Sequence, residues 1–371
     1  MKFIKKLMSD PVLAAAWILA FISLFFTKPD KEYLSYIDWR SLGILWGLMV
    51  VIQGFKENGV FDRIGKSMLV RVNKGWQLAL ILILLCFFSG MLITNDVALI
   101  TFVPFAIMVL KNCGKEKMIL PMVVLQTIGA NMGSMMTPIG NPQNLYIYGV
   151  SGMPLDEFVL RMLPYSLAAL GLLLIGILFL PGKTDEIYDI GEQENKISFN
   201  VIHIVLYTVM FILAVVTVLR IVPWYIMALI IFVVVGIIDR KIIFKADYIL
   251  LLTFIGFFIF TGNLGRIGYI RDMLERIVQG KEVYTSIVTS QFISNVPATL
   301  LLSGFTTNHK NILLGVNLGG LGTLIASMAS LISYKAFADE YKDKKGKYIL
   351  VFTIFNVVFL AFMLLLYMFL G

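Results

Sequence analysis

Long apolar runs recur along almost the whole chain, and they limit its possible folds more than any other feature. About 20 apolar residues span the hydrocarbon core of a bilayer. With 59% hydrophobic and 15% charged residues, the chain is too apolar for a soluble globular protein or a disordered one. We therefore expect an all-α polytopic membrane protein. The runs lie near residues 11–27, 40–56, 76–92, 97–110, 117–150, 158–181, 198–219, 221–238, 247–262, 284–308, 311–334 and 347–370.

Polar residues interrupt the apolar sequence at two places, and each is predicted to be the tip of a re-entrant hairpin. Residues 76–110 contain Thr-Asn-Asp near their centre, and residues 284–308 contain Ser-Asn-Val-Pro. The pieces on either side, roughly 10–17 residues long, are short for full crossings. The hairpin tips are therefore expected at Asn95 and Asn295.

The sequence contains an internal duplication. Residues 129–148 (GANMGSMMTPIGNPQNLYIY) and 315–334 (GVNLGGLGTLIASMASLISY) align without gaps and share seven identities in 20 positions, well above chance. The hairpin tips and three residues further upstream match as well. The matched pairs are Gly129/Gly315, Asn131/Asn317, Gly133/Gly319, Thr137/Thr323, Ile139/Ile325, Leu145/Leu331, Tyr148/Tyr334, Asp38/Asp247, Gly47/Gly256, Gly59/Gly268, Asn95/Asn295 and Ala98/Ala298. Two structurally related halves are therefore predicted.

The number of crossings sets the relative orientation of the two halves. Five predicted crossings separate their starting points, and an odd number places the second half upside down, as in the inverted repeats of many secondary transporters. We expect a first half at 1–182, with a broken helix at 117–150, and a second half at 221–371, with a broken helix at 311–334. A cytoplasmic linker and a connecting helix occupy 183–220.

The basic residues indicate which way the chain is inserted. With the N-terminus in the cytoplasm, most of the 31 Lys and Arg residues fall on the cytoplasmic side, as the positive-inside rule requires. This topology accounts for the net charge of +8, so no nucleic-acid partner is expected. The predicted location is the cell (inner) membrane, crossed several times, with a cytoplasmic N-terminus.

Candidate binding residues lie where helices are predicted to break. Transport sites in inverted-repeat proteins lie near the midplane, where broken helices expose backbone groups to a wet cavity. Glycine lets the backbone unwind, and Asn, Ser and Thr offer donors and acceptors. For any single glycine, close helix packing is the alternative explanation. The predicted substrate-binding residues are Asn95, Asn131, Gly133, Thr137, Gly140, Asn141, Asn144, Ser294, Asn295, Asn317, Gly319 and Thr323.

Asp96 is the only acidic residue expected deep in the membrane, and Val296 stands at the matching position of the second half. An ionisable side chain at that depth is costly and usually functional. Because no Lys or Arg falls at the tips or breaks, an anion would be held by helix N-termini, amides and hydroxyls. An ionised Asp96 would repel it. Asp96 and Thr94 are therefore predicted to couple a proton or cation, with capping of the second hairpin arm as the alternative for Asp96.

These motifs resemble those of the ion transporter superfamily, in particular its arsenite-permease and citrate-carrier branch, which also includes dicarboxylate carriers and sodium/proton antiporters. The residues that carry the resemblance are Asn95-Asp96-Val97-Ala98, Gly129-Ala130-Asn131-Met132-Gly133, Thr137-Pro138-Ile139-Gly140-Asn141-Pro142-Gln143-Asn144, Asn295-Val296-Pro297-Ala298-Thr299 and Asn317-Leu318-Gly319-Gly320. The resemblance implies a secondary active transporter of a small anion or oxyanion, of arsenite or carboxylate type, coupled to protons. A sodium/proton antiporter is the alternative that the same fold supports.

The expected partners are a small inorganic or carboxylate anion, protons or sodium as the coupling ion, the lipid bilayer, and a second copy of the chain in a homodimer. Transport rather than catalysis is expected, because the helices show no acid/base pair or metal cluster. The chain has only two histidines, His203 and His309, and two cysteines, Cys86 and Cys113. Neither a metal site nor a cofactor is therefore predicted.

Overall fold

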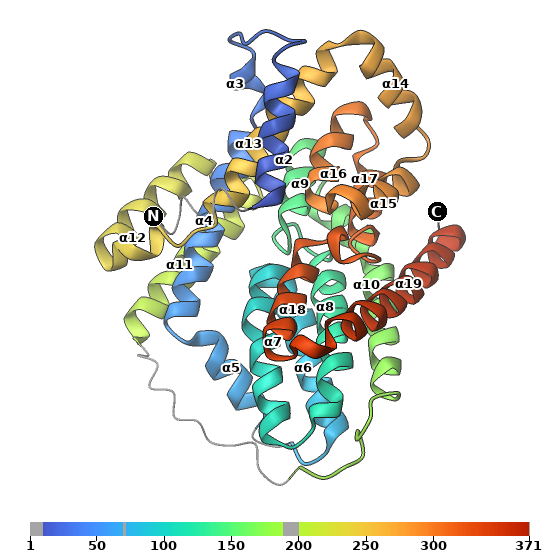
Figure 1. Cartoon of the computed structure of the whole chain (residues 1–371). Helices are drawn as coiled ribbons and strands as arrows, with labels where there is room; N and C mark the ends of the chain where they lie inside the picture. The colour runs from blue at the N-terminus through green and yellow to red at the C-terminus, as the bar shows by residue number, and fades with distance from the viewer. Residues whose placement is uncertain (1–9, 70–71, 188–199, 371) are drawn as a thin grey trace.

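The computed structural model describes residues 10–69, 72–187 and 200–370, and in these residues the fold is helical (Figure 1). Six segments are long and apolar enough to cross a membrane, which confirms the expected all-α polytopic architecture. They are α6 (Gly75–Ile93), α7 (Asn95–Asn112), α10 (Leu155–Ile177), α11 (Val201–Val218), α13 (Tyr248–Arg266) and Lys342–Leu370, which contains α19 (Lys345–Leu370). The predicted cytoplasmic N-terminus and much of the predicted linker fall on residues 1–9 and 188–199, outside the described residues.

The remaining helices are shorter or less apolar. They are α2 (Pro11–Ser23), α3 (Tyr33–Tyr36), α4 (Trp39–Glu57), α5 (Val60–Leu69), α8 (Glu116–Ser134), α9 (Pro142–Ser151), α12 (Trp224–Ile243), α14 (Gly268–Val278), α15 (Glu282–Ile293), α16 (Asn295–Leu302), α17 (His309–Leu318) and α18 (Met328–Glu340). The expected extent of the first helix, 11–27, is wrong at its C-terminal end. After Ser23 the amides of residues 24–26 bond to carbonyls three residues back, which tightens the chain into turns.

The two halves contain matching elements in the same order. The order α2, α4, α5, α6–α7, α8–α9, α10 corresponds to α12, α13, α14, α15–α16, α17–α18, α19, and α11 connects the two series. Matching residues begin matching helices: Asp38 accepts from the Ser41 amide (3.1 Å) at the start of α4, and Asp247 accepts from the Leu250 amide (3.1 Å) at the start of α13. These bonds cap the free amides of each first turn.

The halves pack on each other in a reciprocal way. Helix α2 of the first half packs on α13 of the second, and α12 packs on α4. In Figure 1 the amphipathic helix α5 lies toward the lower end of the molecule and its counterpart α14 at the upper end. Matching elements at opposite ends are what an inverted repeat requires.

Both hairpins are present, with sharp turns at the matched tips. Thr94 connects α6 to α7 with φ 73°, and Ser294 connects α15 to α16 with φ 72°. Residues other than glycine rarely adopt such backbone conformations, which cost about 1–3 kcal/mol each and cluster at functional sites. The expected arm lengths are wrong for the first hairpin, because α6 has 19 residues and α7 has 18. Its first arm begins at Gly75, where residues 73–76 pair with 183–187.

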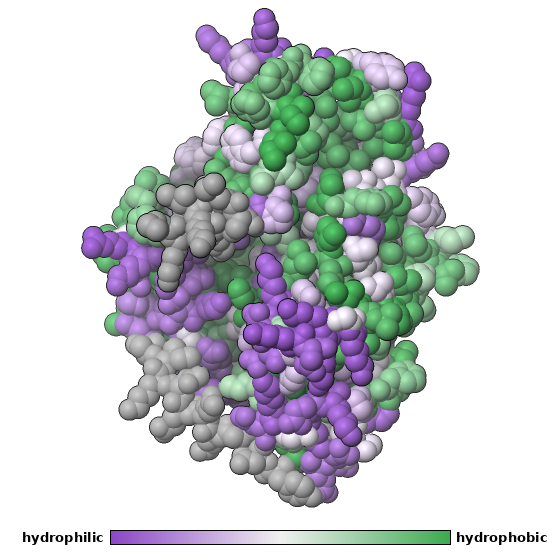
Figure 2. Space-filling view, in the orientation of Figure 1, coloured by the Kyte–Doolittle hydropathy of each residue, from purple (hydrophilic) through white to green (hydrophobic). Residues whose placement is uncertain are grey.

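Apolar side chains cover the outside of the peripheral helices. Leu160 of α10, Ile202 of α11, Ile237 of α12 and Phe369 of α19 are all exposed. Figure 2 shows hydrophobic side chains over much of the face in view, with hydrophilic side chains gathered toward its lower part and its upper rim. Such a surface suits contact with lipid, where exposed apolar groups carry no penalty.

Candidate functional site

The first helix break lies between α8 and α9 and is closed by its own asparagines. Asn141 caps α9 by accepting from the Asn144 amide (2.9 Å). The Asn144 side chain donates to the carbonyls of Ser134 (3.3 Å), Met135 (3.3 Å) and Thr137 (3.0 Å), which the end of α8 leaves without helical partners. The break is therefore a defined structure, held by side chains that the sequence marked as candidates.

The tip of the first hairpin contacts this break. The Asn95 backbone amide donates to the Gly140 carbonyl (3.0 Å), and its side chain donates to Asn131 Oδ1 (3.0 Å). The Thr137 hydroxyl donates to the Met91 carbonyl (2.5 Å) on the first arm. Asn95 and Asn131 are both buried, so the tip lies inside the protein.

Side chains from the two halves meet in hydrogen bonds related by the repeat. Asn141 Nδ2 donates to Asn317 Oδ1 (3.1 Å), and Ser327, at the position that matches Asn141, donates to Asn131 Oδ1 (3.3 Å). Asn317 Nδ2 also donates to Asn144 Oδ1 (2.7 Å). We call this group the asparagine cluster. It consists of Asn95, Asn131, Ser134, Asn141, Asn144, Asn317 and Ser327.

The second break, between α17 and α18, is built differently around Gln291. The Gln291 side chain donates to the carbonyls of Gly319 (2.9 Å) and Leu321 (3.0 Å) and accepts from the Thr323 amide (2.9 Å). The Thr323 hydroxyl donates to the Gln291 carbonyl (3.2 Å), which repeats the bond that Thr137 makes in the first half. Thr323 is exposed. Its place is therefore beside the break and not in the asparagine cluster.

Two of the predicted glycines are needed for close packing. A Cβ on Gly133 would lie 2.0 Å from the Phe87 carbonyl oxygen of α6, and a Cβ on Gly140 would lie 2.0 Å from the Ser134 carbonyl oxygen. Both neighbours are backbone atoms that cannot turn away. Close approach of backbones thus explains both residues, and Gly140 also accepts the Asn95 amide bond.

Four buried polar atoms at the breaks and the second tip have no hydrogen-bond partner among the described residues: Asn131 Nδ2, Gln143 Oε1, Ser294 Oγ and Ser330 Oγ. Asn131 matches Asn317, and Ser330 matches Asn144. Asn317 donates to Asn144 across the two halves, but the equivalent bond from Asn131 to Ser330 is not formed. Ser294 is unpartnered for a local reason. Thr94 accepts from the amide three residues ahead (3.5 Å), whereas the corresponding residue after Ser294 is Pro297, which has no N–H.

The remaining predicted residues lie close to the tips. Asn295 is buried, with its side-chain amide 3.1 Å from where a Cβ on Gly320 would lie. Gly319 packs on Ser290, whose hydroxyl would lie 2.7 Å from a Cβ at that position. Thr94 caps α7. Asn295 and Gly319 therefore lie at the second tip and break, and among the described residues no hydrogen bond joins the Asn295 side chain to the asparagine cluster.

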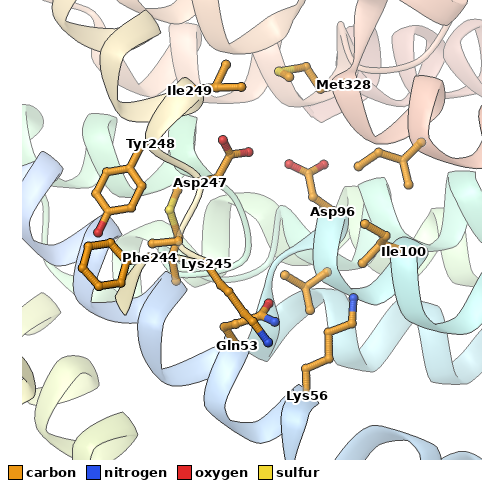
Figure 3. A pocket seen from close by; sticks show the side chains of 14 residues that line it. Gln53, Lys56, Asp96, Ile100, Phe244, Lys245, Asp247, Tyr248, Ile249 and Met328 are labelled. Carbon is orange, nitrogen blue, oxygen red and sulfur yellow. The ribbon is translucent and has the colours of Figure 1, made fainter. Parts of the chain in front are cut away.

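Asp96 lines a cavity of about 430 Å³ (Figure 3). Its backbone amide donates to Asn95 Oδ1 (2.9 Å), which places the cavity one residue from the cluster. The charged residues that line the cavity are Lys56, Asp96, Lys245 and Asp247. Among the described residues no group of His, Cys, Asp and Glu has the arrangement of a metal site.

Three participants were not predicted from the sequence. Ser327 had a usable signal, because it matches Asn141 at the repeat offset of Asn131 and Asn317. Ser134 lies between two predicted residues but has no mark of its own. Gln291 lies four residues before Asn295 at the second tip, and its counterpart Met91 contributes only a carbonyl.

The comparisons with known proteins agree with this architecture. A family model described as "Citrate transporter" matches residues 2–309. The inner membrane protein YbiR of Escherichia coli is 31% identical over 331 residues, 87% of each chain, and an uncharacterized transporter of Methanocaldococcus jannaschii is 32% identical over 305 residues, 82% of each chain. A silicon efflux transporter of Oryza sativa is 33% identical over 150 residues, 40% of this chain and 30% of its own. The chain therefore belongs to the citrate transporter family of membrane transporters.

Proposed function

We propose that this protein is a secondary active transporter that binds a small anion or oxyanion at the asparagine cluster and couples its movement to protons at Asp96. The observation that carries the proposal is the meeting of carboxamides from two matched, oppositely placed halves at one buried point. A site shared by inverted halves can be exposed to either side when one half rocks against the other. The halves would be 1–182 and 221–371, joined by 183–220, with the N-terminus in the cytoplasm and two copies forming a homodimer.

The chemistry of the cluster favours a compact oxyanion of arsenite type over a multiply charged carboxylate. Carboxamides and hydroxyls present both donors and acceptors to the hydroxyl and oxo groups of such a species. In the part of the chain that the structure describes, no Lys or Arg side chain bonds to the cluster. A citrate trianion would have to be desolvated against neutral groups, which is unfavourable. The rice relative is named a silicon efflux transporter, which also supports a small inorganic substrate.

A sodium/proton antiporter is a second candidate, and the cavity beside Asp96 is the observation that favours it. Asp96 and Asp247 both line this cavity, and carboxylate oxygens are suitable ligands for a hard cation. In that case the cation, and not an anion, would be the transported species.

Transport by purified protein in proteoliposomes tests the proposal. The panel comprises arsenite, silicic acid, citrate, succinate and sodium, each with and without a pH gradient. We expect gradient-driven movement of an oxyanion or oxyacid, lost in Asn131→Ala. Asn356→Ala is the matched control, because Asn356 is a buried asparagine whose side chain, within the described residues, bonds only in its own helix (Phe352 carbonyl, 2.8 Å). Movement of sodium alone would establish the antiporter, and movement of nothing on the panel would refute the proposed substrate class.

A further inference from the structure

The cavity beside Asp96 contains a second carboxylate for which the transport site has no use. Asp247 lies between α12 and α13, and Figure 3 shows its carboxylate facing the carboxylate of Asp96 across the cavity. The two groups are close enough for the charge of Asp247 to act on Asp96. Asp247 is exposed and Asp96 is part-buried. Asp247 is therefore the more accessible to solvent of the two carboxylates that line the cavity.

Comparison of the two halves separates this carboxylate from an ordinary helix cap. In the first half, Asp38 accepts from the Ser41 amide with Oδ1 and from the Ser41 hydroxyl with Oδ2, so both oxygens are occupied. In the second half, Leu250 stands where Ser41 would be, and only Oδ1 of Asp247 accepts a bond within the described residues, from the Leu250 amide. Oδ2 of Asp247 is left available to the cavity. The two halves also differ at the hairpin tips. Asp96 at the first tip faces Asp247, whereas the residue that matches Asp96 in the second half is the apolar Val296.

Two lysines also line the cavity. Lys56 extends from the end of α4, and Lys245 precedes Asp247 on the connection between α12 and α13. Lys245 is paired with Glu57 (2.7 Å). Tyr248 of α13 also lines the cavity, and α18 contributes the apolar Met328 and Ile332.

We infer that Asp247 is a second coupling residue, which exchanges protons with solvent and passes them through the cavity to Asp96. The inference rests on the proposed function, since Asp96 is its coupling site. A cavity of about 430 Å³ has room for several water molecules, each of which occupies about 30 Å³. The transfer moves one proton from the Asp247 carboxyl to the Asp96 carboxylate and leaves Asp247 ionised.

Infrared difference spectroscopy of carboxyl protonation tests the coupling directly and needs no substrate. The titration is followed in purified wild-type protein, Asp247→Asn and Asp38→Asn, and the Asp96 signal is assigned by its loss in Asp96→Asn. Asn is as good an N-cap as Asp, so both variants keep their helix starts. We expect Asp247→Asn to move the protonation midpoint of Asp96 to lower pH by roughly half a unit or more, because a neighbouring negative charge is removed. Asp38→Asn is expected to leave the midpoint unchanged.

The same variants are then compared in proton-driven transport. The inference predicts that the pH profile of Asp247→Asn is displaced to lower pH and that the profile of Asp38→Asn coincides with the wild type. An unchanged Asp96 midpoint in Asp247→Asn, or equal effects of the two variants, would overturn it. A coupled titration in a protein that moves no member of the panel would refute the proposed function and leave the carboxylate pair established. If Asp96 and Asp247 titrated independently in a protein that transports a member of the panel, the inference would be refuted and the proposed function would stand.

Discussion

Replacement of Gly133 by alanine is expected to separate the first hairpin from the broken helix on which it packs. The added Cβ would lie 2.0 Å from the Phe87 carbonyl oxygen, 2.8 Å from its carbon and 3.0 Å from its Cα, where real Cβ atoms stay beyond 3.0 Å. Helices α6 and α8 would therefore have to move apart by about 1 Å in a tightly packed interior. Overpacking of this kind typically costs ~1–3 kcal/mol, of which alanine's higher helix propensity returns up to ~1 kcal/mol.

Gly129→Ala provides the matched control, one turn earlier on the same helix. Its added Cβ would meet no atom closer than 3.6 Å, which is ordinary van der Waals contact. Thermal unfolding of the detergent-purified variants measures the difference. We expect Gly133→Ala to melt several degrees below the wild type and Gly129→Ala to melt at or above it. Equal melting temperatures for the two variants would refute the packing argument.

Three further changes have definite expected outcomes. Ser294 is a predicted substrate-binding residue whose hydroxyl has no partner among the described residues. Pro297→Ala supplies an N–H that can donate to this hydroxyl, so the substrate affinity measured in transport should fall while the melting temperature stays unchanged. Asn317→Ala removes two bonds to the first half, and it should abolish transport and lower the free energy of unfolding by ~1–3 kcal/mol. The hydrogen bond from Arg266 lowers the pKa of Asp30, so this pair stabilises the fold above the unfolded pKa of about 3.9 and the gain is lost as pH falls through the folded value. Asp30→Asn should therefore lower the melting temperature slightly at pH 7, and its difference from the wild type should shrink as the pH falls below about 3.9.

The helices, the hairpin tips and the matched halves were predictable because they depend on local patterns. The length of an apolar run predicts a membrane crossing, a polar interruption predicts a hairpin tip, and the equal spacing of matched residues predicts the repeat. The reciprocal bonds of Asn141 with Asn317 and of Ser327 with Asn131 follow once the repeat is known. The short amphipathic helices α5 and α14 were missed, since an apolar-run criterion does not register a helix with a strong polar face.

The rest depends on tertiary contacts that the sequence does not encode locally. Nothing in the residues around Gln291 indicates that its side chain would satisfy three backbone groups of a break about 30 residues further along the chain. The placement of Asp247 opposite Asp96 depends on how α4, α7, α13 and α18 meet around the cavity. The free hydroxyl of Ser294 was predictable in principle, because Pro297 is visible in the sequence.

Comparison of the wild type with Asp96→Asn under an imposed pH gradient tests the central claim most directly. Asparagine keeps the shape and the capping ability of aspartate but cannot titrate. Proteoliposomes with wild-type protein should move the transported oxyanion faster when a gradient is applied. Those with Asp96→Asn should contain a folded protein whose transport is the same with and without the gradient. If Asp96→Asn kept the full response to the gradient, the coupling site would lie elsewhere, since Thr94 and not Asp96 caps α7.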